Sequence, residues 1–485
     1  MKDFNYYLDS LGEIGFVEEL MHSLIYASGL PRVHPGELVL FESGDLGQVF
    51  SLTPEKIEVL LLTRANLKVG SKLVRTDTRM QIPVGVGLLG RVIDPLGNPL
   101  DGAKLTDTED VRTVDIAPPK IVERVEVQKP LITGVTLVDL VVPLGCGQRE
   151  LVIGDRKTGK TDFLLQSMVT QAKLGSICIY AQIGQKQFDI KKMSEFFAET
   201  GIKKNTVLVA SSSSDPAGVV FQTTYTAMTI AEYFRDKGLD VLLILDDMTT
   251  HARNYREISL LAKRFPGRAS YPGDIFYVHA RLIERAGNFK KGSITALPVA
   301  ESILGDLSGY IQTNLMAMTD GHIFFDIELY NQGKRPSVNP FLSVTRVGHQ
   351  TQTDLQRDLS RELSSFLVTY EKMKQFMHFG AEVGETAKKI LALGNKVDSF
   401  FNQSPTASIP LEINMIILGG LWAGVWSETK EADLRRQMER LVLAYNTEGS
   451  FKKQVDDLIT QSKSFSDLVN FIRRNNEFLT SKITG

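Results

Sequence analysis

The segment GDRKTGKT spans Gly154 to Thr161 and directly follows the apolar run LVI at residues 151–153. It matches the pattern G-x-x-x-x-G-K-T, and helical sequence (DFLLQSMVTQ) follows it. Glycines let backbone N–H groups approach phosphate oxygens, and the lysine brings a positive charge to them. The threonine hydroxyl can reach Mg²⁺. Strand, glycine loop and helix together predict a phosphate-binding loop, against the plainer alternative of a glycine-rich turn.

A second apolar run, DVLLILDD, ends in Asp246 and Asp247. A carboxylate at the end of a neighbouring parallel strand can hold the hydration shell of Mg²⁺. Asp246 follows the apolar run directly and is the better candidate, whereas Asp247 suits a helix cap or a turn. We therefore expect ATP or ADP with Mg²⁺, and Thr161 and Asp246 as the metal-binding residues. The expected loop contacts are Gly154, Asp155, Arg156, Lys157, Thr158, Gly159, Lys160 and Thr161.

Composition excludes several other classes of protein. The 485 residues are 43% hydrophobic and 23% charged, with a net charge of −2, so a general nucleic-acid or membrane coat is not expected. Cys146 and Cys178 are too few for a disulfide framework or a zinc quartet. The N-terminus lacks the features of a signal or transit peptide. The longest apolar runs, such as residues 413–426, fall short of the ~20 residues that span a bilayer.

Apolar patterning changes twice along the sequence. Residues from about 13 to 82 alternate with period two between frequent turns, which predicts a β-barrel or sandwich. Residues 84–102, rich in Gly and Pro, are predicted to be a linker and turn region. Buried strands then alternate with helices, and charged helical periodicity follows after about residue 353. The predicted domains are an N-terminal β-barrel (1–82), a central α/β P-loop domain of RecA-like type (83–352) and a C-terminal helical bundle (353–485).

Longer ordered strings carry a family resemblance over nearly the whole sequence. They include ISLLAKRFPGRASYPGDIFYVHARLIERAG (258–287), GSITALPVAE, and IQTNLMAMTDGHIFFDIELYNQGKRPSVNPFLSVTRVG (311–348). With these strings the protein resembles the alpha subunits of F-type ATP synthases. The phosphate loop is also alpha-like, with Asp155 and Arg156 after its first glycine and Lys157 where the family usually has Gln.

The resemblance implies an assembly and a location. Three alpha and three beta subunits would form an alternating ring around a gamma-subunit shaft, held by a peripheral stalk and attached to a membrane sector that moves protons or sodium ions. The protein would then be peripheral, on the cytoplasmic side of a bacterial membrane, without a span of its own and without a nucleic-acid partner.

Gln185 in the segment AQIGQKQ predicts that the site holds nucleotide without hydrolysing it. Catalytic subunits of the family have Glu in the tripeptide GER, and the tripeptide here is Gly184-Gln185-Lys186. A neutral amide can bond water but cannot take up its proton, and losing a general base costs ~10²–10⁴-fold in rate. Two alternatives stay open: a solvent-facing loop residue, and a glutamine that orients water as in some nucleotidases.

The resemblance also implies a contribution to a neighbouring subunit. Arg346 in LSVTRVG matches the family's arginine that reaches the γ-phosphate held by beta, and Ser343 matches a position that activity requires. A surface salt bridge is the alternative for Arg346. Tyr330, Arg335 and Pro336 match the family's adenine pocket, and Gln403 in FFNQSP is a further candidate there.

Other features depart from the family or carry no chemistry. The family usually begins with a helix of some twenty-odd residues that binds the peripheral stalk, whereas the barrel pattern here starts almost at once. Ala269 stands where Glu is common. His251, His279 and His349 share no ligand spacing and are predicted to be structural.

Three hypotheses follow. The first is a non-catalytic alpha subunit that holds Mg-ATP and supplies Arg346 to beta. The second is a self-sufficient hexameric P-loop ATPase, such as a secretion motor or helicase, which would need a carboxylate where Gln185 stands. The third is a structural ring member without nucleotide, which Lys160, Thr161 and Asp246 argue against.

Overall fold

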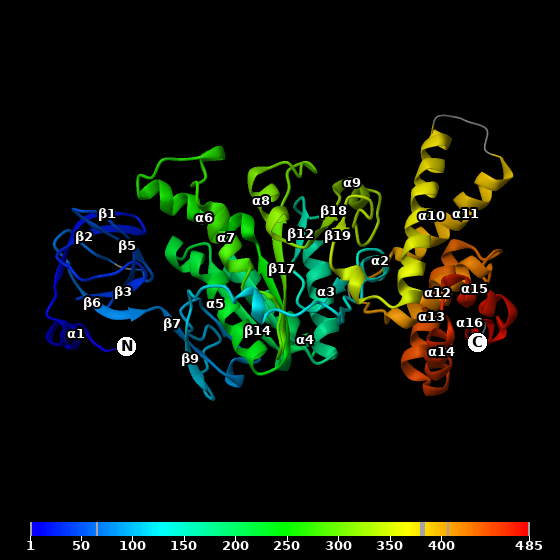
Figure 1. Ribbon diagram of the computed structural model, residues 1–485, viewed down its shortest axis with the longest axis horizontal. Coiled ribbons are helices and arrows are strands. Elements are labelled where there is room, and N and C mark those ends of the chain that lie inside the picture. Colours follow the sequence, from blue (N-terminus) through cyan, green and yellow to red (C-terminus); the bar gives the residue numbers. More distant parts are fainter. Residues whose placement is uncertain (1, 65, 379–383, 405–406, 484–485) are drawn as a thin grey trace. The chain divides into compact units, whose positions relative to one another are not determined.

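Figure 1 shows the computed structural model as a ribbon. The protein comprises two compact units. The first unit comprises residues 1–126, 172–301 and 306–319, and the second comprises 127–171, 302–305 and 320–485. The domain boundaries expected at residues 82/83 and 352/353 stay a prediction. The structure describes residues 2–64, 66–378, 384–404 and 407–483.

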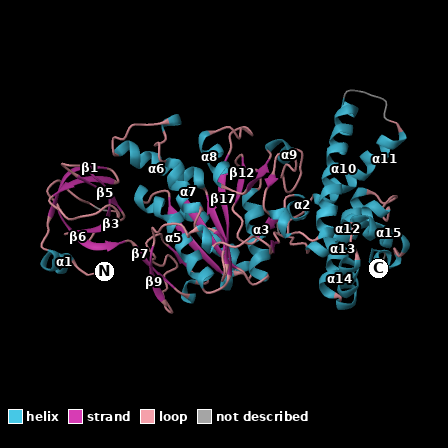
Figure 2. Ribbon diagram, viewed as in Figure 1, coloured by secondary structure: helices cyan, strands magenta, loops and turns pink. Residues whose placement is uncertain are grey.

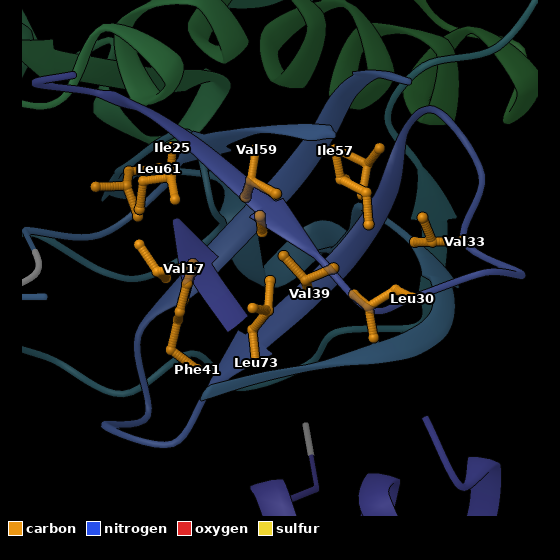
Figure 3. Close-up of a cluster of buried hydrophobic side chains, with 12 residues drawn as sticks. Val17, Ile25, Leu30, Val33, Val39, Phe41, Ile57, Val59, Leu61 and Leu73 are labelled. Atoms are coloured by element: carbon orange, nitrogen blue, oxygen red, sulfur yellow. The ribbon is translucent and has the colours of Figure 1, made fainter. Parts of the chain in front are cut away.

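The N-terminal part of the first unit is a closed barrel in the order β1-β2-β5-β4-β3-β6. Alternating residues point inward and form an apolar core that includes Val17, Ile25 and Val59 (Figure 3). The helix α1 (Phe4–Leu11), which the sequence pattern did not predict, packs Tyr7 against the outside of the barrel. The strands are β1 (Gly15–Met21), β2 (Leu24–Ser28), β3 (Glu37–Phe41), β4 (Leu46–Leu52), β5 (Ile57–Leu61) and β6 (Lys72–Arg79).

The rest of the first unit includes a parallel sheet, with neighbouring strands in the order β17-β15-β13-β14-β8. Its central strands are buried on both faces, which explains their continuous apolar runs. The strands are β8 (Val92–Ile93), β13 (Ile177–Gln185), β14 (Thr206–Ser212), β15 (Asp240–Asp246) and β17 (Ser293–Glu301); the helices between them are α4 (Gln187–Glu199), α5 (Ala217–Asp236), α6 (Met248–Leu261) and α7 (Ile275–Ile283).

The linker predicted over residues 84–102 is wrong at its centre. Val92 and Ile93 form β8 and pair in parallel with Leu208 and Val209 of β14. A strand of two residues shows no periodicity, and the surrounding Gly and Pro mask it.

The second unit contains the phosphate-loop segment. β12 (Glu150–Gly154) pairs in parallel with β18 (Gly321–Phe325), and β19 (Val344–Thr345) pairs with β18 in the opposite direction. Helix α3 (Lys160–Lys173) follows β12 after the loop. Two short helices, α2 (Thr136–Val141) and α9 (Ile327–Asn331), lie in the same unit.

The described C-terminal residues are helical, as predicted (Figure 2). Helix α12 carries the apolar run that the sequence analysis judged too short for a bilayer, and its residues 413–421 are all buried. A helix that is apolar all round is a buried helix. In the described ranges, no helix is both long and apolar enough to cross a membrane. The helices are α10 (Asp354–His378), α11 (Glu385–Phe401), α12 (Leu411–Ala423), α13 (Glu431–Thr447), α14 (Gly449–Gln461), α15 (Phe465–Arg474) and α16 (Glu477–Ile483). The predicted fold class, with an N-terminal barrel, a central α/β segment and a helical C-terminal region, is confirmed.

Candidate nucleotide site

The loop at Gly154–Thr161 has the backbone of a tight phosphate cradle. Lys157 and Gly159 have φ angles of 62° and 88°, in the left-handed region that turns backbone N–H groups inward. A side chain at Gly154 would place its Cβ 2.4 Å from the carbonyl oxygen of Phe325 on β18, so only glycine fits there. The Lys160 ammonium donates to the carbonyl oxygens of Gly154 and Asp155, both at 2.6 Å.

Side chains that the sequence analysis did not single out hold this loop in place. The Ser302 hydroxyl donates to the Asp155 carboxylate at 2.5 Å, which also accepts from the backbone N–H of Gly305. The Ser337 hydroxyl donates to the carbonyl oxygen of Thr158 at 2.6 Å. The Asp155 carboxylate therefore stabilises the loop from within. Ser302 comes two residues after Ala300, the last residue of a buried apolar run, and that position was the available sequence signal.

Three other loop residues present their side chains to solvent: Arg156, Lys157 and Thr161. Thr161 is the second residue of α3, at the helix N-terminus where the macrodipole favours an anion. The hydroxyl, the two basic side chains and the helix end are suited to a row of charged phosphates and its cation.

Four of the residues expected around a nucleotide base lie in the second unit with the loop. The Arg335 guanidinium stacks over the Tyr330 ring at 3.5 Å, and its Nη1 donates to the Tyr330 carbonyl oxygen. Arg335, Pro336 and Gln403 line a cavity of about 20 Å³ together with Thr158 and Gly159 of the loop. The structure thus brings the loop together with three of the four residues expected around a base. The fourth, Tyr330, stacks against Arg335.

Gln403 is buried and fixed by backbone partners. Its Oε1 accepts from the Thr136 N–H at 3.0 Å, and its Nε2 donates to the Gly134 carbonyl oxygen at 2.7 Å. The backbone N–H of Gln403 donates to the carbonyl oxygen of Arg335 at 2.7 Å. Gln403 therefore connects the start of α2 to the residues that would surround a base.

Asp246 and Asp247, in the first unit, have different roles. Asp246 is the last residue of β15, and its Oδ2 accepts from the Tyr180 hydroxyl at 2.6 Å. Asp247 caps α6, because its carboxylate accepts from the N–H of Thr250. The assignment of Asp247 to a helix cap is confirmed.

Gln185 is the last residue of β13 and is half-exposed. Its carbonyl oxygen accepts from Ser213 N–H at 2.9 Å, and the preceding Gly184 N–H donates to Ser211 Oγ at 2.9 Å. The strand end that carries Gln185 is therefore fixed. The carboxylate of Glu301, at the end of β17, forms an ion pair with Arg253 at 3.2 Å.

Arg346 follows β19 in the second unit, and its side chain is exposed. Its backbone N–H donates to the carbonyl oxygen of Asp320 at 3.0 Å. Ser343 Oγ accepts from Phe324 N–H at 3.0 Å and donates to the carbonyl oxygen of Asn339 at 2.7 Å. The backbone before and at Arg346 is therefore held to β18. Among the residues that the structure describes, the guanidinium forms no ion pair.

His251 and His279 form a buried pair that the sequence did not predict. His251 Nδ1 lies 3.1 Å from His279 Nε2, and His251 Nε2 lies 3.2 Å from the carbonyl oxygen of Phe221. Since that carbonyl can only accept, Nε2 of His251 carries its proton, and His279 donates to the free Nδ1. Burial lowers the pKa of His251 to about 4 and that of His279 well below its ordinary value. In the described part of the protein, no cluster of three or more His, Cys, Asp and Glu side chains could hold a metal ion.

The histidine pair predicts a loss of stability on acidification. Between pH 6.5 and about 4 the unfolded protein takes up protons that the folded protein does not, so the free energy of unfolding falls as the pH falls. Replacing His279→Gln should make this fall shallower by about 1.4 kcal/mol per pH unit. Thermal unfolding of both proteins from pH 7.5 to 4.5 measures the difference, and parallel curves would contradict the expectation.

The phosphate loop, with the strand before it and the helix after it, defines a nucleotide-binding protein of the P-loop class. Residues 134–345 match the model of the nucleotide-binding domain of the ATP synthase alpha/beta family, and residues 352–472 match the model of that family's C-terminal domain. The protein is 37% identical to ATP synthase subunit alpha of Neorickettsia sennetsu, over 96% of its own length and 93% of the relative. It is 40% identical to ATP synthase subunit alpha of Dictyoglomus turgidum, over 84% of its own length and 81% of the relative. The protein therefore belongs to the family of ATP synthase alpha subunits.

Proposed function

We propose that this protein is a non-catalytic alpha subunit of a rotary F-type ATP synthase, which binds Mg-ATP and does not hydrolyse it. The observation that carries the proposal is Gln185, an amide at the end of β13. A general base must accept the proton of the attacking water, and an amide cannot. Glu301, the acid at the end of β17, is engaged with Arg253.

The nucleotide contacts in this proposal come from residues with separate tasks. Lys160 and the backbone N–H groups of the loop would bind the phosphates, and Thr161 would offer its hydroxyl to Mg²⁺. Asp246 would bind the cation's water shell, and Mg²⁺ would neutralise phosphate charge. On the base side, Arg335 and Tyr330 supply stacking faces, and Pro336 and Gln403 shape the pocket.

Arg346 would act in a neighbouring beta subunit. Its guanidinium is exposed and its backbone is held to β18. The side chain can therefore extend from a fixed backbone toward another subunit. A guanidinium placed at the γ-phosphate neutralises charge that develops in the transition state. Ser343 would hold the segment before Arg346 in its conformation through its hydrogen bonds to Phe324 and Asn339.

The proposed assembly is the one the family resemblance implies. Three copies of this protein would alternate with three beta subunits around a gamma shaft, with a peripheral stalk and a membrane sector that couples ATP turnover to proton or sodium transport. The protein would lie on the cytoplasmic side of a bacterial membrane, attached through these partners.

Reconstitution tests the proposal. The purified protein should bind Mg-ATP without turnover, and mixing it with beta and gamma subunits should produce ATP hydrolysis. Rapid hydrolysis by the protein alone would indicate a self-sufficient motor instead. Failure to bind any nucleotide would indicate a ring member of purely structural role.

A further inference from the structure

Gln182 is a buried amide near the end of β13. Its side chain lies on β13 and is 4% exposed, and its Oε1 makes no hydrogen bond in the described structure. An unpaired polar atom in the interior costs about 1–3 kcal/mol, so native proteins seldom keep one without a reason. Neither the fold nor the roles assigned above use this oxygen.

The strand register places Gln182 beside the carboxylate proposed to hold the metal's water. β13 and β15 run parallel, and Gln182 is paired with Asp246. Tyr180 lies two residues earlier and therefore on the same face of β13 as Gln182. Because the Tyr180 hydroxyl reaches Asp246 Oδ2 at 2.6 Å, this is the face on which the Asp246 carboxylate lies.

The carboxylate of Asp246 and the amide oxygen of Gln182 are both acceptors, so a donor placed between them would bond to both. Water bound to a divalent cation is such a donor, and Mg²⁺ usually keeps several of its waters in protein sites. We propose that Gln182 Oε1 accepts a hydrogen bond from a water of the Mg²⁺ shell that Asp246 holds. Gln182 thus contacts the metal ion only through a bound water, and this inference rests on the proposed binding of Mg-ATP.

The test compares ATP binding with and without the metal. Calorimetric titration of ATP into the purified protein, at a series of free Mg²⁺ concentrations and in EDTA, gives the half-saturating Mg²⁺ concentration. Loss of an outer-shell partner typically costs 10–100-fold in metal affinity. Gln182→Ala should therefore raise the half-saturating Mg²⁺ about tenfold, while ATP affinity in EDTA stays as in wild type.

Two further variants make the result specific. Gln182→Met keeps the side-chain volume without the acceptor, so it should show the same rise in half-saturating Mg²⁺, and it keeps the test decisive if the smaller alanine impairs folding. Gln222→Ala is the matched control, because Gln222 is another buried glutamine of the first unit whose amide donates to Gln48. Its Mg²⁺ dependence should equal that of wild type.

The outcomes separate this inference from the proposed function. Wild-type Mg²⁺ dependence in Gln182→Met would overturn the inference and leave Mg-ATP binding intact; Gln182 would then have a packing role only. Failure of the wild-type protein to bind ATP at all would overturn the proposed function itself.

Discussion

Replacing Arg346→Ala is expected to reduce ATP hydrolysis by the reconstituted complex at least about 10³-fold, the lower end of the effect of an arginine finger. The reason is that the exposed guanidinium would no longer neutralise charge on the γ-phosphate bound by beta. The same substitution should leave ATP binding by the isolated protein unchanged, because the role proposed for the arginine is at the neighbouring site. Steady-state hydrolysis by the complex and equilibrium binding by the isolated protein measure the two effects.

Arg435→Ala is the matched control for this prediction. Arg435 is an exposed arginine of α13 that pairs with Glu439 one helical turn away at 3.2 Å. Exposed pairs of this kind contribute about 0–1 kcal/mol, so activity should be close to wild type. A fall of less than tenfold in Arg346→Ala would assign that arginine to the surface instead of the reaction.

Replacing Arg285→Ala should lower the free energy of unfolding by about 3–5 kcal/mol, because it removes both hydrogen bonds that Arg285 donates to the buried carboxylate of Glu232. Arg285 is fully buried and donates to both oxygens of Glu232, at 3.0 and 2.6 Å. It also donates to the Val114 carbonyl oxygen and to Thr229 Oγ1, so its hydrogen bonds tie α5 to two other segments of the first unit. Urea denaturation followed by circular dichroism measures the loss.

Arg281→Ala provides the comparison within the same region. Arg281 pairs with Asp115 at 3.0 Å, but the arginine side chain is 31% exposed and the aspartate 50%. Water can replace this partner, so the expected loss is about 0–1 kcal/mol. Equal losses in the two variants would show that burial of the Arg285 pair is not what makes it important.

The elements that could be predicted from the sequence are those whose signal is local. The phosphate loop lies in eight consecutive residues, and β15 reads as an apolar run that ends at Asp246. Asp247 could be assigned as a cap because capping depends on residues one turn away. The barrel and the C-terminal helices could be assigned because period two and period 3.6 persist over many residues.

The features that sequence reasoning missed depend on contacts between distant segments. His251 and His279 lie on different helices, and no spacing rule predicts that their imidazoles form a hydrogen bond. Ser302 and Ser337 support the loop from segments far along the sequence, and single serines are too common to stand out. The sequence also cannot show that Gln182 Oε1 is buried without a hydrogen-bond partner among the described residues, because burial depends on the folded neighbours.

The central claim is that the site holds ATP and cannot cleave it because Gln185 offers no base. The most direct measurement incubates the purified protein with γ-labelled Mg-ATP and follows bound nucleotide and released phosphate together over hours. We expect stoichiometric binding of intact ATP with no steady release of phosphate. Continuous phosphate release by the isolated protein would contradict it.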